Sequence, residues 1–194
     1  MNLFLTGLLD DIEHLRTELS RLISDLSNEE LQRPPRPNSW SIISCVGHLT
    51  KTGREYLPLL HRSANNAPTI NRADSLDYRP TWMGKIFLSN ISPSSTRRLP
   101  APKKFKPGPT LDSESTLSEF GVQLDELSEL IRTLDGKDYN RVRFASPVSP
   151  LIRFSLADGL SIVVIHARRH LAQIARTRKV VLELGDEYRA QATL

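Results

Sequence analysis

Four stretches of this 194-residue chain place apolar residues at the three- and four-residue spacing of an amphipathic helix. In residues 3–26 this apolar stripe is formed by Leu5, Leu8, Leu9, Ile12, Leu15, Leu19, Leu22, Ile23 and Leu26. Pro34, Pro35 and Pro37 prevent the helix from continuing, and Ser27 or Asn28 is expected to cap a short following turn. The segment therefore predicts one long helix with a single buried face.

The other three stretches cover residues 38–62, 115–134 and 155–178, and each begins with a recognisable helix start. Ser, Thr, Asp and Asn side chains cap the free backbone N–H groups of a helix, and a Glu or Asp three residues later completes a capping box. The expected starts are Asn38 or Ser39 for the second stretch, Thr116 with Glu119 for the third, and Ser155 with Asp158 for the fourth.

Four long helices joined by long irregular connections predict an all-α four-helix bundle that forms one domain over residues 1–194. The longest connection is an irregular insertion, rich in proline and lysine, at about residues 64–112. Residues 81–91 are expected to form a short helix within it, and the prolines from Pro93 to Pro109 impose an extended path on the rest. No convincing run of strands is present. A loop of this length is either functional or without fixed structure.

The composition and the N-terminal segment exclude several classes of protein. No apolar run approaches the ~20 residues that cross a bilayer, and the N-terminal segment lacks the basic region and cleavage site of a signal peptide. The single cysteine, Cys45, excludes an internal disulfide and a cysteine-cluster metal site, so we expect a cytoplasmic protein. The net charge of +4 is too small to indicate nucleic-acid binding, although basic residues concentrate between Arg97 and Lys106.

The five histidines include one pair, His166 and His170, that lies four residues apart in a predicted helix. At about 100° per residue, both lie on the flank of their helix rather than at the centre of its apolar stripe. His48 occupies the corresponding flank of the second helix. Facing helices would bring the three imidazoles to one point, which is how side chains on different helices of a bundle bind a metal. Alternatively, a histidine on a helix flank is a surface residue or a half-buried one paired with a carboxylate.

The segments NSWSIISCVGHL and HARRHLAQI together resemble the DinB/YfiT-like superfamily of four-helix-bundle proteins. SPVSPLIRFSL and the loop containing KKFKPG also resemble one subgroup of that family. In the family, one histidine of the second helix and two of the last bind a divalent ion, so the resemblance implies His48, His166 and His170 as ligands. His14 and His61 match no motif position and are expected at the surface.

One position departs from the family pattern, because Ser44 stands where many relatives carry an acidic residue shortly before the first histidine. Glu55 and Gln173 are candidates to replace that acid beside the metal ligands. Arg169 is a candidate to orient a substrate carboxylate, with a solvated basic helix face as the alternative. No group is assigned a catalytic role. Cys45 is expected to be a small buried residue, and Trp40 is expected to anchor the start of its helix in the core.

Three imidazoles leave coordination positions of a divalent ion free, as in a catalytic site. Such an ion lowers the pKa of bound water or thiol and polarises carbonyls. Imidazole ligands suit zinc or nickel, with iron or manganese as alternatives. The resemblance implies either a thiol S-transferase that uses a low-molecular-weight thiol or a hydrolase, with a small molecule as substrate.

Two other functions remain open at this stage. One is a non-catalytic, stress-related binding module that forms a homodimer, in which a metal is structural or absent. The other is nucleic-acid binding through the basic segment from Arg97 to Lys106, which we do not expect because no recognition motif is present and phosphate contacts alone give unspecific, salt-sensitive binding.

Overall fold

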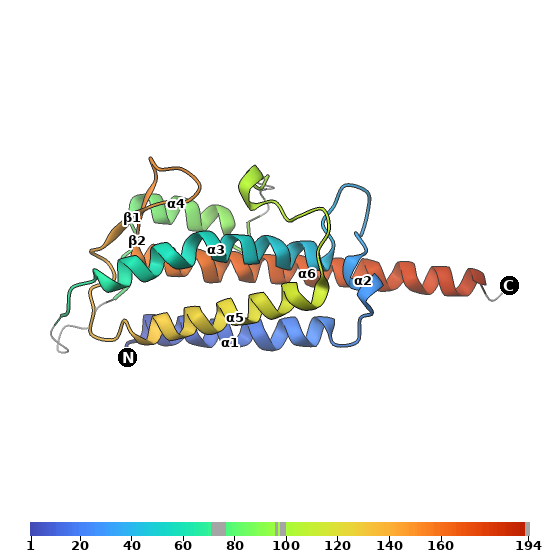
Figure 1. Ribbon diagram of the computed structural model, residues 1–194, viewed down its shortest axis with the longest axis horizontal. Coiled ribbons are helices and arrows are strands. Elements are labelled where there is room, and N and C mark those ends of the chain that lie inside the picture. The colour runs from blue at the N-terminus through green and yellow to red at the C-terminus, as the bar shows by residue number, and fades with distance from the viewer. Residues whose placement is uncertain (71–76, 96, 98–99, 193–194) are drawn as a thin grey trace.

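The computed structural model describes residues 1–70, 77–95, 97 and 100–192, with side chains as far as residue 184. Its four long helices, α1 (Leu3–Ile23), α3 (Ile42–Asn65), α5 (Ser113–Arg132) and α6 (Leu156–Ala192), lie side by side as a bundle (Figure 1). Helix α3 contacts α5 and α6, and α1 contacts the same two helices. The predicted all-α four-helix bundle is confirmed.

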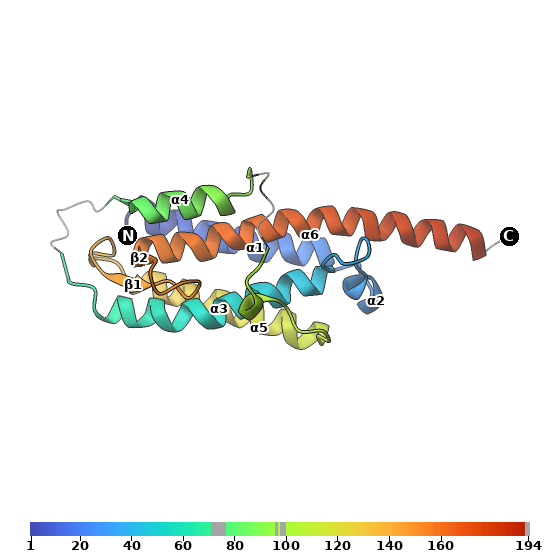
Figure 2. The same ribbon diagram turned by 90° about the horizontal axis from the view of Figure 1, so that it is seen from above.

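Helices α1 and α6 run in one direction, and α3 and α5 run in the other (Figures 1 and 2). The chain therefore travels back along the bundle between α3 and α5, within the long connection predicted at 64–112. That connection contains α4 (Trp82–Ile91), which packs on α6, and a 3-10 turn (Lys103–Phe105), which packs on α3. The expected short helix over 81–91 is confirmed.

The chain turns after α1 through a short capped helix. Helix α1 ends at Ile23, slightly earlier than predicted, and α2 (Asn28–Gln32) follows it. The Ser27 hydroxyl accepts a hydrogen bond from the Glu30 backbone N–H, and the Glu30 carboxylate accepts one from the Ser27 N–H. This capping box satisfies backbone donors at both positions, and it confirms the turn expected after α1.

Helix α3 begins later than predicted. The Ser41 hydroxyl accepts a hydrogen bond from the Ser44 N–H at 3.1 Å and is the N-cap, so the predicted caps Asn38 and Ser39 are wrong. Ser39 donates its hydroxyl to the carbonyl of Arg36 in the preceding turn, and Asn38 adopts a positive φ of 60°. Both residues therefore belong to the turn. Short polar side chains are equally common in turns and at helix N-caps, because they hydrogen-bond to nearby backbone groups in both.

Helix α5 begins two residues before the predicted start, and the predicted capping box is wrong. The Asp112 carboxylate accepts a hydrogen bond from the Ser115 N–H at 2.8 Å. Thr116 lies inside the helix, where its hydroxyl donates to the Asp112 carbonyl, and Glu119 forms an ion pair with Arg54 of α3. An aspartate is a better N-cap than a threonine, so the earlier position is preferred.

Helix α6 begins as predicted and ends later. The Ser155 N–H donates to the Asp158 carboxylate, and the Asp158 N–H donates to the Ser155 hydroxyl, each at 3.0 Å. The helix continues to Ala192 instead of ending near residue 178, so its C-terminal part projects beyond the other helices (Figure 1). No proline interrupts this segment, and Arg178 joins it to the end of α1 by donating to the Leu22 carbonyl.

Two short strands precede α6, contrary to the expectation of no strands. Strand β1 (Arg143–Ala145) pairs antiparallel with β2 (Arg153–Ser155), and Phe144 lies opposite Phe154. Both aromatic side chains are buried against the bundle. Three-residue strands leave almost no alternating pattern in a sequence, and their burial depends on the helices that cover them.

The core confirms the apolar stripes. The inner face of α3 is formed by residues at helical spacing, and all of them are buried: Ile42, Val46, Leu49, Gly53, Tyr56 and Leu60. Cys45 has no exposed surface, and burial raises the pKa of its thiol to about 12, so it is the small buried residue that was expected. Within the described part of the chain, no helix has both the length and the apolar character of a membrane span.

Candidate metal centre

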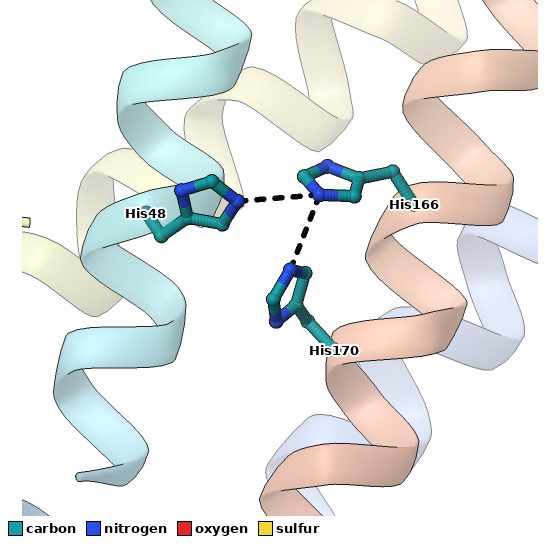
Figure 3. Close-up of side chains that lie close together, drawn as sticks. All are labelled: His48, His166 and His170. Atoms are coloured by element: carbon teal, nitrogen blue, oxygen red, sulfur yellow. Dashed lines mark hydrogen bonds between the residues drawn. The ribbon is translucent and has the colours of Figure 1, made fainter. Parts of the chain in front are cut away.

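His48 on α3 and the pair His166 and His170 on α6 direct their rings into the space between the two helices (Figure 3). One nitrogen of each ring lies within 4.8 Å of those of the other two. The Nε2 atoms of His48 and His166 are 3.2 Å apart, and those of His166 and His170 are 3.1 Å apart. The structure thus brings together the three residues named as candidate ligands.

The distances and the donor set fit one divalent ion. Imidazole nitrogens bind zinc at about 2.0–2.1 Å, so two of them at a tetrahedral angle lie roughly 3.3 Å apart. The two Nε2–Nε2 distances here are close to that value. Among the described residues no cysteine, aspartate or glutamate joins the cluster. Three protein ligands leave a position for water or substrate, which is typical of catalytic zinc sites.

A hydrogen bond to the main chain sets the tautomer of His48. Its Nδ1 lies 2.7 Å from the carbonyl oxygen of Phe105 in the 3-10 turn. Since a carbonyl only accepts, Nδ1 carries the hydrogen and donates it, and Nε2 presents a lone pair to the other two rings. Metal-binding histidines are commonly oriented in this way by a second hydrogen bond.

The three rings have too few hydrogens for their contacts. With the His48 hydrogen on Nδ1, any hydrogen between His48 and His166 must sit on His166 Nε2. That nitrogen then has no lone pair to accept from His170, although their Nε2 atoms are also within contact distance. If His170 donates instead, two lone pairs face each other between His48 and His166. A cation bound among the rings would receive a lone pair from each of the three nitrogens.

The environment keeps the rings neutral. Burial lowers the pKa of His48, against a smaller opposite effect of the hydrogen bond to Phe105. Burial lowers the pKa of His170 to about 3, and the nearby His48 adds to that shift. Burial, followed by His170, His48 and Arg169, places the pKa of His166 well below its usual value. Neutral imidazoles are the form that binds metal, because protons compete for the same lone pairs.

Two contacts of the cluster were not assigned to the site from the sequence. One is the Phe105 carbonyl, and any residue offers a carbonyl, so no sequence signal marks it. The other is the Trp40 ring, whose centroid lies 4.9 Å from that of His48 and 6.0 Å from that of His170. Trp40 packs against the core as expected, but its ring also covers one side of the histidines. Its position eight residues before His48 was the available signal.

The described residues of the segment between α4 and α5, 92–95, 97 and 100–106, are called the strap; they lie beside α6 at Ser92 and beside α3 at the 3-10 turn (Figure 2). Arg169 anchors the first part of the strap. Its guanidinium donates to the carbonyls of Ser92, Ser95 and Arg97 at 2.7, 3.0 and 2.6 Å. Three of its five N–H groups are therefore occupied by main chain, so orientation of a substrate carboxylate by Arg169 stays a prediction.

The far end of the strap is attached to α3. The Phe105 side chain is buried, and Lys51 of α3 donates its ammonium to the Lys106 carbonyl at 2.8 Å. Glu55, a candidate neighbour of the metal ligands, forms an ion pair with Lys104 at 2.7 Å instead of contacting the three rings. The strap is thus joined to both helices that carry the histidines.

Gln173 and Ser44, the other residues discussed from the sequence, lie at different distances from the three rings. Gln173, one turn beyond His170 on α6, interacts with that ring and raises its pKa against the effect of burial. The remaining nitrogen of His170, Nδ1, is buried and has no well-formed hydrogen bond among the described residues. Ser44 belongs to the N-terminal cap of α3, where its hydroxyl lies 2.9 Å from that of Ser41.

His14 and His61 lie outside the cluster, as expected. His14 is exposed on α1. His61 is half-buried near the end of α3, and its Nε2 lies 2.8 Å from the Glu126 carboxylate of α5. Both provide histidine controls for experiments on the candidate metal centre.

The bundle interior behind His166 is nearly filled. A cavity of about 20 Å³ lies there, which has room for about one water molecule. Its walls are mainly apolar side chains of all four long helices, with Thr52 and Gln123 as polar neighbours. The bundle interior behind His166 therefore has no space for a molecule larger than water.

Comparison with known proteins identifies the family of this chain. A family model described as the DinB superfamily matches residues 11–174. The chain belongs to the DinB superfamily. This confirms the resemblance stated from the sequence motifs.

Two relatives of this DinB-superfamily chain come from Bacillus subtilis. The uncharacterized protein YuaE of strain 168 is 22% identical over 167 residues, which cover 86% of this chain and 94% of YuaE. The solved structure of YfiT, described as a probable metal-dependent hydrolase with an unusual four-helix bundle topology, is 17% identical. It matches with a TM-score of 0.59 over 93% of this chain and 87% of YfiT, which supports the fold.

Proposed function

We propose that the protein is a metal-dependent enzyme acting on a small molecule, in which His48, His166 and His170 bind one divalent ion. One observation carries this proposal: three buried or half-buried imidazoles converge with fewer hydrogens than their contacts require. Zinc or nickel is the first choice of ion for three imidazoles, and iron or manganese is the next.

The residues beside the cluster favour a reaction that needs no general base from the protein. An ion in an open three-imidazole site lowers the pKa of bound water or thiol and polarises a carbonyl. The nearby carboxylate of Glu55 is paired with Lys104, and Gln173 is an amide that does not act as a base. The described residues thus place no general base beside the cluster, which favours a nucleophile that is deprotonated without one.

Two reactions meet that condition: hydrolysis by water and transfer of a low-molecular-weight thiol to a small electrophile. The description of YfiT as a probable metal-dependent hydrolase supports the first. The family resemblance supports the second. In both, the Phe105 carbonyl holds His48 with its Nε2 toward the substrate side, and Trp40 shields one face of the rings from water.

The test begins with metal content. Elemental analysis of protein loaded with zinc or nickel should find about one ion per chain, and His166→Ala should remove it, whereas His61→Ala should not. Hydrolysis of p-nitrophenyl acetate and transfer of 2-mercaptoethanol to 1-chloro-2,4-dinitrobenzene should then be measured for loaded and EDTA-treated protein.

The two parts of the proposal fail separately. A chain that binds no ion, or an ion that His166→Ala does not displace, would contradict the metal site. A stoichiometric ion without effect on either reaction would indicate the non-catalytic binding module that the sequence left open.

A further inference from the structure

The connection that covers the histidine cluster carries charge of one sign. From Arg79 to Leu111 the sequence has no aspartate or glutamate, whereas it has seven basic residues: Arg79, Lys85, Arg97, Arg98, Lys103, Lys104 and Lys106. The whole chain is nearly balanced, with 26 basic and 22 acidic residues. The positive charge is therefore concentrated in this connection.

Three of these lysines are close neighbours in sequence of Phe105, whose carbonyl orients His48. Lys103, Lys104 and Lys106 flank Phe105, whose carbonyl accepts the His48 hydrogen bond. All three lysines are exposed. Lys104 is neutralised by Glu55, while Lys103 and Lys106 have no ion pair among the described residues.

These lysines belong to or directly follow the turn that contacts His48. The bundle side behind His166 has room for about one water molecule, and the Trp40 ring covers another side. The 3-10 turn that begins at Lys103 borders the cluster on a third side, through the contact of the Phe105 carbonyl with His48. Charges of one sign beside a low-dielectric site attract ligands of opposite charge and raise their local concentration.

We propose that the site takes a small anionic substrate, whose carboxylate or similar group is bound by the ammonium groups of Lys103 and Lys106. This inference rests on the proposed function, because it assumes that the reacting group of the substrate lies at the histidine cluster. Flexible ammonium groups suit an anion of variable shape, since lysine acts as a mobile point charge. The strap thereby selects substrates by charge.

A nucleic acid is the competing ligand for a basic segment. Proteins that bind nucleic acids distribute basic residues along a groove or helix face and contact several phosphates. Here the unpaired lysines are confined to one short turn beside a deep cluster of histidines. That arrangement favours a small anion.

The experiment uses the cobalt-loaded protein and two thiols of similar size. Mercaptosuccinate carries two carboxylates and 1-thioglycerol carries none, and sulfur binding to cobalt is followed by the charge-transfer absorption. We expect Lys103→Gln/Lys106→Gln to weaken mercaptosuccinate binding about tenfold at low salt, as two partly exposed ion pairs would. Its 1-thioglycerol affinity and its cobalt content should match those of the unchanged protein.

The control variant is Lys85→Gln/Lys179→Gln, which removes the same charge from α4 and from an exposed position on α6. It should bind both thiols as the unchanged protein does. Equal mercaptosuccinate affinity in the two double variants would overturn the inference, as would failure of mercaptosuccinate to bind. Salt-sensitive binding of a DNA duplex that requires Lys103 and Lys106 would assign the lysines to nucleic acid and also overturn it. Loss of cobalt from the unchanged protein would instead contradict the metal site.

Discussion

The Nδ1 of His48 donates a hydrogen bond to the carbonyl of Phe105 at 2.7 Å, across 57 positions of sequence. This contact joins the face of α3 that carries His48 to the strap. It also determines which nitrogen of His48 faces the other two histidines. The orientation of this candidate ligand is therefore controlled by a loop and not by its own helix.

Phe105→Ala should weaken metal binding, because the buried ring fixes the strap that supplies the carbonyl. Loss of an orienting contact beside a metal ligand costs roughly 10–100-fold in affinity. Isothermal titration with zinc measures the effect, and Phe105→Leu, which keeps a buried apolar side chain, should lose much less. Identical affinities in all three proteins would show that the contact does not support the site.

Metal-free protein should lose stability as the pH falls from about 6.5 toward 3. Each of the three histidines has a lowered pKa in the folded state, so the unfolded chain binds more protons below its own pKa of about 6.5. The free energy of unfolding is highest above that pH. It decreases by about 1.4 kcal/mol per pH unit for each ring that stays neutral.

Urea unfolding at several pH values measures this dependence. His170→Gln should show a shallower decrease, because it removes the ring whose pKa lies at about 3. An exposed-histidine variant, His14→Gln, should behave as the unchanged protein does. A free energy of unfolding that is constant between pH 7 and pH 4 would contradict the burial of neutral histidines.

Asp158→Asn should destabilise the start of α6 and the helix that packs on it. The fully buried carboxylate accepts hydrogen bonds from the Ser155 N–H, the Tyr78 hydroxyl, and the N–H and hydroxyl of Thr81. An amide replaces one accepting oxygen with a donor and leaves buried donors unpaired, at a cost of about 2 kcal/mol or more. Thermal unfolding measures the loss, and the exposed Asp10→Asn is the control.

Hydrogen exchange offers a second measure of the Asp158 change. Amides of α4 should exchange faster in Asp158→Asn, since Thr81 caps that helix and bonds to the carboxylate. Unchanged exchange in α4 together with lower stability would restrict the effect to α6.

Arg169→Lys should loosen the strap without unfolding the bundle. A lysine cannot reach three carbonyls with the geometry of a guanidinium, so the contacts to Ser92, Ser95 and Arg97 should be lost in part. Limited proteolysis should then cut the strap faster. Arg168→Lys, at the neighbouring position that pairs with Asp11 on α1, should be cut as slowly as the unchanged protein.

Helices α3, α5 and α6 differ in how accurately the sequence predicted them. The stripe on α3 was predicted because burial imposes a periodicity that is visible in the sequence. The start of α5 was misplaced because Asp112 and Thr116 are both acceptable caps in isolation. The end of α6 was placed too early because no proline follows Arg178 to mark where the helix stops.

In the candidate metal centre too, spacing within one helix could be predicted from the sequence, whereas distances between helices could not. The four-residue spacing of His166 and His170 is local, so helical geometry alone places them on one face. The distance to His48 is not local, and it depends on how α3 packs on α6. Nothing in the sequence indicated that Glu55 would pair with Lys104, because that contact depends on the path of the strap.

The sequence by itself determined four amphipathic helices, their burial faces and the three histidines, because periodicity and spacing act within a single helix. Only the tertiary structure decided the distances between the imidazoles, the tautomer of His48 and the position of the basic strap. These depend on contacts between segments far apart in the chain, whose packing is a property of all the helices together.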